Sequence, residues 1–216
     1  SQLSDKSLIV NAYLFEEYNV GSLIMRTDEK GNKNWLKKWA EKFHIRDMVI
    51  QNDEIFLLCF DEKKKENSLK RFDANGIETK SAVFKADSLF TKNIEPVSGG
   101  GLFVVGTNMG VDNGVILMRF NRKLEPLWQI PWRTKAKFQR LVDAKQLSNG
   151  DIIAHGYVDD AFYLARIKSS EENVSTHGMS VFPNPAEGSE IYLNINPAEQ
   201  TDISIKLLSS YGADFG

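Results

Sequence analysis

Short apolar runs separated by turn residues make up most of the chain. In the clearest example, the glycines at 99–101 precede the apolar run 102–105, and after a loop a second run, 115–118, leads to Arg119 and then to Trp128. Runs of this length, rich in β-branched and aromatic residues and bounded by Gly, Asn and Asp, are typical of strands joined by hairpins. The pattern therefore predicts two strands, a turn and a third strand.

This unit occurs four times. The arginine after the second run recurs at spacings of 45, 48 and 47 residues. The anchor positions are Arg26, Arg71, Arg119 and Arg166. The equivalent first apolar strands span residues 7–13, 53–60, 101–107 and 150–157. A period near 45 residues with about four short strands per unit is the signature of β-propeller blades.

Two further features of the repeat have physical roles. Residues 28–31 and 73–76 are expected to form hairpin turns, in which Asp bonds the backbone ahead and Gly supplies a positive φ. Trp35 and Trp128 are expected to be large packing residues between neighbouring sheets, with the indole N–H bonded nearby. The charged run 62–66 is interpreted as a solvated hairpin tip.

The Asp-x-x-Gly-x-x-x-Trp run from Asp28 to Trp35 resembles the blade repeat of quinoprotein-like propellers. The whole unit is similar to propeller-like repeats of exported Bacteroidota proteins, which implies a repeat domain over residues 1–168. The second repeat has Lys80 in place of the tryptophan, the fourth ends without a tryptophan strand, and the first begins almost inside a strand. We therefore expect either the C-terminal part of a larger ring or four blades closed by strands shared between the chain ends.

The composition changes after residue 168. Residues 169–177 are polar and lack an apolar period, which predicts a linker. Residues 178–216 resemble the C-terminal sorting domain of the type IX secretion system, in which an aromatic residue and Pro-Asn-Pro precede a Gly, two strands and a turn Gly. The matching residues are Phe182, Pro183, Asn184, Pro185, Gly188, Ile203, Ile205, Tyr211 and Gly212.

The same residues are consistent with a small β-module. The two prolines fix φ and give a stiff entry, and residues 191–195 and 203–208 alternate as half-buried strands do. The simpler alternative is an ordinary small β-sandwich. The family domain has further strands after the turn Gly, so residues 178–216 are expected to be a truncated β-sandwich. The resemblance implies an export signal that docks on the secretion machinery and is cleaved on arrival, with the cargo released or attached to surface lipopolysaccharide.

Composition and charge narrow the function classes. The chain has 216 residues, 42% of them hydrophobic, and a net charge of -2, so no basic field favours nucleic acid. No apolar run approaches the roughly 20 residues of a membrane-spanning helix. The first residues have neither the basic nor the apolar region of a signal peptide, so for an exported protein we expect that peptide to be removed or outside this sequence. The single cysteine, Cys59, is interpreted as a buried small hydrophobe, the alternative being a reactive thiol.

A search for catalytic or metal-binding motifs gives little. His44, His155 and His177 have no partners at metal-ligand spacing, and no nucleophile elbow, phosphate-binding loop or zinc signature is present. The turns at Asp28 and Asp73 and residues 112–114 leave weak calcium binding as an alternative to their turn-forming role. The sequence predicts no cofactor and no enzymatic activity.

The expected function is that of a secreted or cell-surface cargo protein of the type IX system. Its repeats would bind a surface glycan or protein ligand that the sequence does not identify. Two other classes stay open: a propeller enzyme, either a quinoprotein-like dehydrogenase or a glycan hydrolase, and a purely structural surface scaffold.

Overall fold

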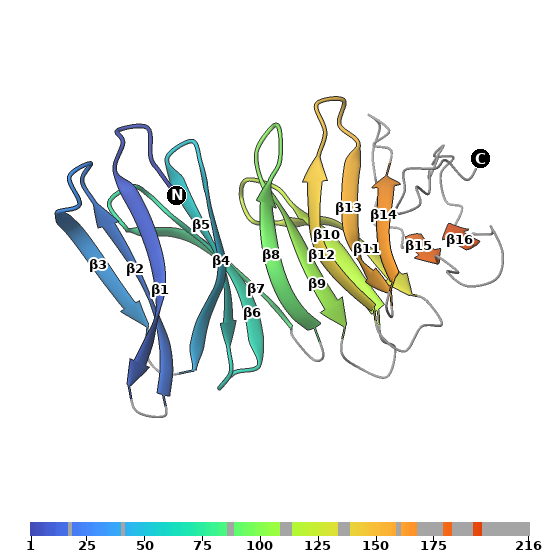
Figure 1. Cartoon of the computed structure of the whole chain (residues 1–216), viewed down its shortest axis with the longest axis horizontal. Helices are drawn as coiled ribbons and strands as arrows, with labels where there is room; N and C mark the ends of the chain where they lie inside the picture. The colour runs from blue at the N-terminus through green and yellow to red at the C-terminus, as the bar shows by residue number, and fades with distance from the viewer. Residues whose placement is uncertain are drawn as a thin grey trace. The chain divides into compact units, whose positions relative to one another are not determined.

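The computed structural model describes residues 1–16, 19–39, 42–85, 89–108, 114–133, 139–158, 161–167, 179–182 and 192–195. Within these ranges every regular element is a β-strand, so the predicted all-β fold class is confirmed. The chain forms two compact units, Ser1–Asp87 and Ser88–Gly216. Figure 1 shows that both units are built from small, twisted sheets.

The first unit contains two antiparallel sheets, here called sheet 1 and sheet 2. Sheet 1 has the order β1-β2-β3 and sheet 2 the order β4-β5-β6-β7. The strands are β1 (Leu8–Glu16), β2 (Asn19–Thr27), β3 (Lys33–Trp39), β4 (Phe43–Gln51), β5 (Glu54–Asp61), β6 (Glu66–Phe72) and β7 (Glu78–Lys85).

The second unit contains sheets 3 and 4. Sheet 3 has the order β16-β15-β11-β10-β9-β8, and sheet 4 has the order β12-β13-β14. The strands are β8 (Leu89–Pro96), β9 (Leu102–Asn108), β10 (Gly114–Phe120), β11 (Pro126–Arg133), β12 (Gln139–Gln146), β13 (Ile152–Val158), β14 (Ala161–Ile167), β15 (Met179–Phe182) and β16 (Tyr192–Ile195).

A complete repeat is a four-stranded meander, as in sheet 2 and in β8 to β11 of sheet 3. The predicted strand with the tryptophan is the last of the meander, and it carries Trp35 in β3, Lys80 in β7 and Trp128 in β11. Among the described residues, sheet 1 contains the second to fourth strands of the pattern, and sheet 4 contains the first to third. The first strands of the meander, β4, β8 and β12, are elements that the repeat analysis did not assign.

The turns between the third and fourth strands follow the predicted chemistry. Asp28 and Asp73 each accept, through Oδ1, hydrogen bonds of 2.8–2.9 Å from the backbone N–H groups two and four residues ahead. Gly31 and Gly76 supply the positive φ, at 87° and 78°. In the third repeat the glycine is replaced by Leu124, which has a φ of 61° and is buried, so apolar burial offsets the backbone strain.

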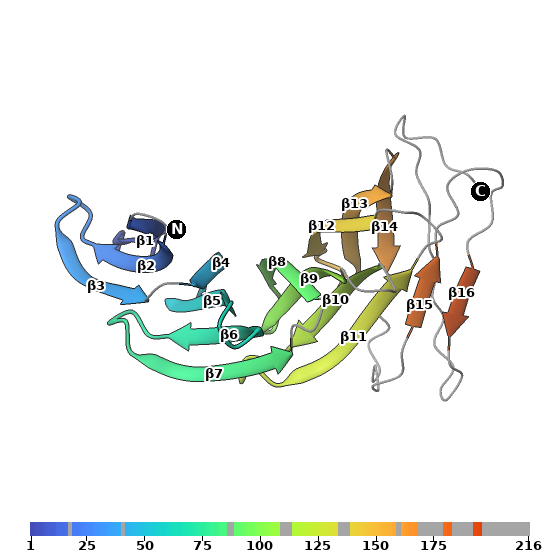
Figure 2. The same cartoon turned by 90° about the horizontal axis from the view of Figure 1, so that it is seen from below.

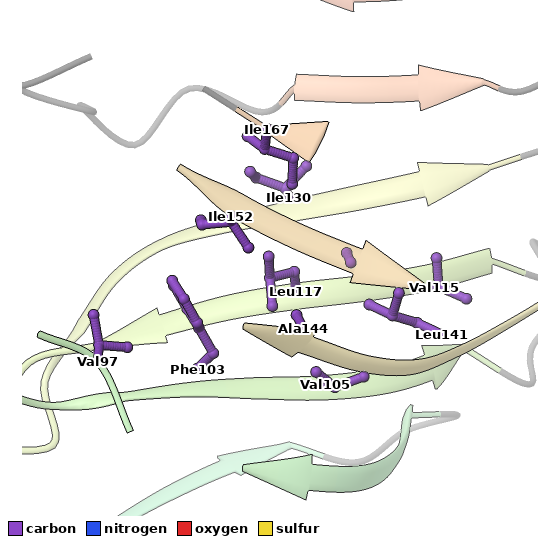
Figure 3. Packing of buried hydrophobic residues seen from close by; sticks show 11 residues of the cluster. Val97, Phe103, Val105, Val115, Leu117, Ile130, Leu141, Ala144, Ile152 and Ile167 are labelled. Atoms are coloured by element: carbon purple, nitrogen blue, oxygen red, sulfur yellow. The ribbon is translucent and has the colours of Figure 1, made fainter. Parts of the chain in front are cut away.

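The sheets of each unit pack face to face around an apolar core, with the alternation of strand residues placing one set inward. In the second unit the core lies between sheets 3 and 4, as Figure 3 shows. Its residues are Val97, Phe103, Val105, Val115, Leu117, Ile130, Leu141, Ala144, Ile152, Ala154 and Ile167.

The core of the first unit lies between sheets 1 and 2. Its buried residues are Leu3, Ile9, Ile24, Ile45, Ile55, Leu57, Cys59 and Phe72. Cys59 is fully buried and not in a disulfide, so the packing interpretation holds. Burial raises the pKa of the Cys59 thiol to about 12, which keeps the thiolate, the reactive form, unpopulated near neutral pH.

The C-terminal region contributes two described strands. β15 pairs in parallel with β11 through Trp132 and Val181, and β16 pairs antiparallel with β15. Figure 2 shows β15 beside β11 and β16 on the other side of β15. The remaining residues of 178–216 lie outside the described residues, as does the linker 169–177, so the domain boundaries at 168 and 178 stay predictions.

Candidate functional site

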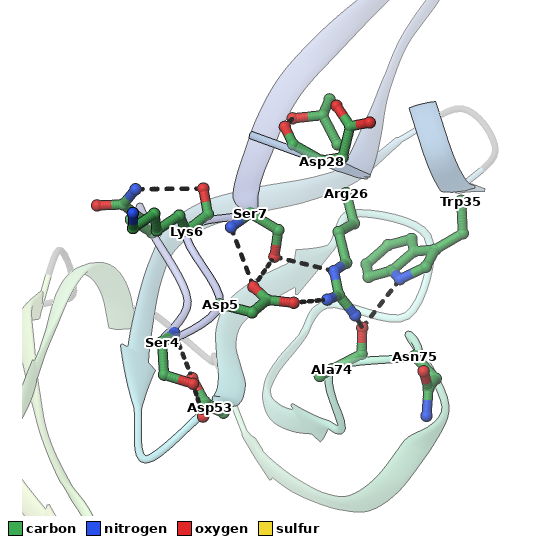
Figure 4. Close-up of polar contacts among 12 residues, drawn as sticks. Ser4, Asp5, Lys6, Ser7, Arg26, Asp28, Trp35, Asp53, Ala74 and Asn75 are labelled. Atoms are coloured by element: carbon green, nitrogen blue, oxygen red, sulfur yellow. Dashed lines mark hydrogen bonds and ion pairs between the residues drawn. The ribbon is translucent and has the colours of Figure 1, made fainter. Parts of the chain in front are cut away.

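Three of the anchor arginines, Arg26, Arg119 and Arg166, connect the third strand of the meander to the turn before its second strand. Figure 4 shows Arg26, whose Nε donates to Ser7 Oγ at 3.0 Å and whose Nη2 pairs with the Asp5 carboxylate. Its Nη1 donates to the Ala74 carbonyl of sheet 2 at 2.8 Å. The indole Nε1 of Trp35 donates to the same carbonyl at 3.0 Å. Arg26 and Trp35 therefore fasten sheet 1 to the β6–β7 turn.

The later anchors have the same role. Arg119 donates through Nη2 to the Gly100 carbonyl at 2.9 Å and lies over the Phe103 ring, 5.6 Å from its centroid. Burial lowers the pKa of Arg119, without ending its cationic state near neutral pH. Arg166 donates through Nε and Nη2 to the Asp151 carboxylate at 2.8 and 2.5 Å.

Arg71 and Trp128 complete the set of repeat anchors. Arg71 Nε donates to Thr79 Oγ1 at 3.1 Å and lies 3.8 Å from the Glu54 carboxylate. Trp128 packs against the core of the second unit, with its ring 5.7 Å from that of Phe103. The anchors thus hold turns and sheets together.

A different feature does gather polar groups. The first strand of each of three sheets contains a β-bulge, where the pairing register shifts between Ile45 and Asp47, Thr91 and Asn93, or Leu141 and Asp143. The residues at the shift are Arg46, Lys92 and Val142. A bulge re-aims side chains out of the regular alternation, and bulges are frequent beside functional sites.

In the second unit the bulges of β8 and β12 bring four half-buried side chains together: Lys92, Asn93, Arg140 and Asp143, here called the first-strand cluster. Asn93 Nδ2 donates to Asp143 Oδ1 at 2.9 Å and so joins sheet 3 to sheet 4. The same oxygen accepts the backbone N–H of Ala144 at 2.8 Å. The Asp143 carboxylate is therefore held in one orientation.

The first-strand cluster contains more positively than negatively charged side chains. Burial lowers the pKa of Lys92, the nearby Arg140 lowers it further, and Asp143 acts in the opposite direction. Two cations thus share one carboxylate in a partly desolvated setting. Ammonium and guanidinium groups in such an arrangement hold carboxylate, sulfate or phosphate groups, and the Asn93 amide oxygen is an acceptor suited to a hydroxyl.

The equivalent region of the first unit is already paired. Arg46 lies over the ring of Phe60, 4.7 Å from its centroid, and burial lowers the Arg46 pKa while Tyr13 and Glu62 oppose that shift. His44 Nε2 lies 2.7 Å from Glu62 Oε1. The exposed lysines of the charged run 62–66 form a solvated tip as predicted, whereas Glu62 is drawn into this contact.

Other predicted features fall elsewhere. His155 lies 5.8 Å from the Phe162 ring, centroid to centroid, on a sheet face, and His177 lies outside the described residues. Among the described residues no group of three His, Cys, Asp or Glu side chains could hold a metal ion. Across the same residues the structure contains no helix of the length and hydrophobicity needed to cross a membrane. A hollow of about 280 Å³ lies over β10 and β11, lined by Met118, Phe120, Pro126, Leu127, Trp128, Gln129 and Pro131.

The sorting-motif residues cannot be assembled into a site. Phe182 is the last residue of β15. Pro183, Asn184, Pro185, Gly188, Ile203, Ile205, Tyr211 and Gly212 lie outside the described residues.

The sequence contained one signal for the first-strand cluster. In each of the three first strands, two consecutive residues interrupt the alternation of side chains, and an apolar residue follows them. The second residue of the pair is Asp47, Asn93 or Asp143, and the spacing between these positions is close to the repeat period. The repeat analysis began at the next strand and did not include them.

Comparison with known proteins gives a fold likeness only. No protein family and no curated protein matches the sequence. Among solved structures, a protein of unknown function from Bacteroides caccae, determined by crystallography, resembles this chain with a TM-score of 0.50 and 11% sequence identity. The match covers 95% of this chain and 71% of that one, and at this identity it shows a shared fold.

Proposed function

We propose that this protein is a secreted or cell-surface binding protein whose repeat sheets hold an anionic glycan at the first-strand cluster. The observation that carries the proposal is the pair of cations, Lys92 and Arg140, beside a single fixed carboxylate. Uronic acid polymers present carboxylates next to hydroxyl groups, and both are complementary to this cluster. A protein ligand with surface carboxylates would use the same chemistry.

The binding proposal is tested with polygalacturonate as the probe and neutral galactan as the control polymer. Lys92→Ala and Arg140→Ala should each weaken polygalacturonate binding by about tenfold or more, since each removes a charge-assisted hydrogen-bond donor. Lys145→Ala is the matched control, because Lys145 is an exposed lysine on the same strand, β12. Equal affinity in all four proteins would refute the proposal, and release of reducing ends would favour the hydrolase alternative.

The export part of the proposal rests on residues 178–216 and their resemblance to type IX sorting domains. A pull-down from outer-membrane extracts of a Bacteroidota cell, with the full chain and with a chain ending at residue 177, tests it. Secretion-machinery components should be captured only by the full chain. Capture by neither protein, or equally by both, would make residues 178–216 an ordinary β-module and leave the glycan proposal unaffected.

A further inference from the structure

The two sheets within each unit pack in the same way. The front face of the first sheet, defined here as the face that carries the anchor arginine, covers the back face of the second. Ile9 and Ile24 on the front of sheet 1 pack against Ile55 and Leu57 on the back of sheet 2. In the second unit, Phe103 and Leu117 on the front of sheet 3 pack against Ile152 and Ala154 on the back of sheet 4. Figure 3 shows Phe103, Leu117 and Ile152 of this contact.

Two other faces, the front of sheet 4 and the back of sheet 1, expose apolar side chains. The front of sheet 4 exposes Tyr157 and Phe162, at 46% and 49%, beside the half-buried Leu164 and His155. The back of sheet 1 exposes Leu8, Val10 and Leu36, at 41%, 40% and 39%. Leu8 and Val10 pair with the same positions of the anchor-bearing strand in sheet 1 as Ile55 and Leu57 do in sheet 2. The two residues of sheet 2 are fully buried.

The turn before the second strand shows the same contrast. Leu3 and Val97 occupy equivalent positions in sheets 1 and 3, and both are buried, at 5% and 2%, against the sheet that follows. Their equivalent in sheet 4, Leu147, is 36% exposed. The front side of sheet 4 is therefore built like a surface that another sheet covers.

In each unit, a hydrogen-bonded contact between the two sheets accompanies the apolar packing. Ser98 donates its backbone N–H and its hydroxyl to Gln146 Oε1 of the next sheet, at 2.9 and 2.5 Å. Ser4 makes the equivalent two bonds to the Asp53 carboxylate, at 2.7 and 2.5 Å. The serine at this position in sheet 4 is Ser148, and it is exposed.

The acceptor for that serine exists at the other open face. Gln2 precedes Leu3 and Ser4 as Gln146 precedes Leu147 and Ser148. Its Nε2 donates to the carbonyl four residues ahead at 3.2 Å, and Gln146 makes the same bond at 3.3 Å. Gln2 is exposed, and its Nε2 bond holds the side chain by the same local contact as in Gln146, whose oxygen accepts from Ser98.

We propose that two copies of this chain associate head to tail, with the front of sheet 4 in one copy covering the back of sheet 1 in the other. Tyr157, Phe162 and Leu147 pack on Leu8 and Val10, and Ser148 bonds Gln2. The contact repeats the packing found within each unit. Because the two faces differ, the association is heterologous, and each copy keeps one open face for a further copy. It uses none of the residues of the first-strand cluster, and it would also serve the scaffold alternative.

The test is the size of the full-length protein from about 1 µM to about 1 mM, by sedimentation velocity and light scattering. We expect concentration-dependent oligomers. Val10→Glu on the back face or Phe162→Glu on the front face should each abolish them, because a charge would be buried in an apolar contact. Val83→Glu is the matched control, since Val83 is a strand residue with 61% exposure that lies on neither face, and it should assemble as the unaltered chain does. Circular dichroism and thermal unfolding establish that all three variants are folded.

Mixing provides the decisive measurement. Val10→Glu retains an intact front face and Phe162→Glu an intact back face, so equal amounts of the two should form a dimer that grows no further. Gln2→Ala and Ser148→Ala should each weaken assembly by about two- to tenfold. If the protein is a monomer at every concentration, the proposal is overturned. This holds whether another segment of the chain or nothing covers the two faces. Failure of the mixed variants to form a dimer would overturn it as well.

Discussion

The indole of Trp35 lies directly on Gly76, so that a Cβ at position 76 would come within 3.0 Å of Cε2 of the ring. The contact joins β3 of sheet 1 to the β6–β7 turn of sheet 2. Gly76 also has a φ of 78°, which L side chains disfavour. Backbone conformation and inter-sheet packing thus both require glycine at this position.

Gly76→Ala should therefore destabilise the protein more than the loss of a turn glycine alone. The matched control is Gly31→Ala, at the equivalent turn position with a φ of 87° and no atom within 4 Å of the added Cβ. Strain alone should cost Gly31→Ala about 1 kcal/mol, whereas Gly76→Ala should lose about 2 kcal/mol or more because Trp35 must also move. Urea unfolding measures both. Equal losses would show that the Trp35 contact contributes nothing.

Because the Cys59 thiol is buried, we expect the protein to lose stability at alkaline pH. Its pKa is about 12 in the folded chain against the ordinary value of 9.0, so the unfolded chain loses its thiol proton first as pH rises. Between pH 9 and pH 12 the unfolded state binds fewer protons, and the free energy of unfolding falls with increasing pH. Cys59→Ala should remove this component and leave the slope due to other groups. Unfolding free energies of the two proteins, compared from pH 8 upward, should converge; parallel curves would contradict the assignment.

In the anchor pair of Arg166 and Asp151 the carboxylate is the buried partner, with 8% of the Asp151 side chain exposed against 40% for Arg166. Arg166→Met should destabilise the second unit by about 1–3 kcal/mol, because it leaves a buried carboxylate without its cationic partner. The double variant Arg166→Met with Asp151→Asn should recover part of that loss. Chemical denaturation of the two single variants and the double variant gives the coupling energy, and additive effects would show that the pair is not coupled.

The parts of the fold that were predictable are those with local chemistry. Asp28 and Asp73 bond the backbone ahead of them, and the glycines that follow accept a positive φ, so the turns follow from four-residue patterns. The first strands were missed because the bulges at Arg46 and Lys92 interrupt the alternation that identifies a strand.

Burial of equivalent positions was not predictable at all. Leu3 and Leu147 occur in nearly identical sequence, yet one is buried and the other is exposed. The difference depends on which sheet lies next to each, a relationship between distant segments that a local pattern does not encode. The same reason explains why the first-strand cluster emerges only when β8 and β12 are brought together.

The bond between Asn93 and Asp143 gives a pH-dependent test of that cluster. Asn93→Asp would replace the donor at 2.9 Å with a second carboxylate. We expect the repulsion between the two carboxylates at contact distance to exceed the attraction of Lys92 and Arg140, and so to raise the folded-state pKa of the pair above its unfolded value. The variant should therefore be less stable than the unaltered chain at pH 7, and the deficit should shrink as pH falls and one carboxyl is protonated. Asn93→Ala is the control, because it removes the bond without adding charge, and its deficit should vary little with pH. Urea unfolding from pH 7 to pH 4 distinguishes the two variants. A constant deficit for Asn93→Asp would mean that the two side chains are not in contact in solution, and the joint between sheets 3 and 4 would then rest on the apolar core and the bonds from Ser98 to Gln146.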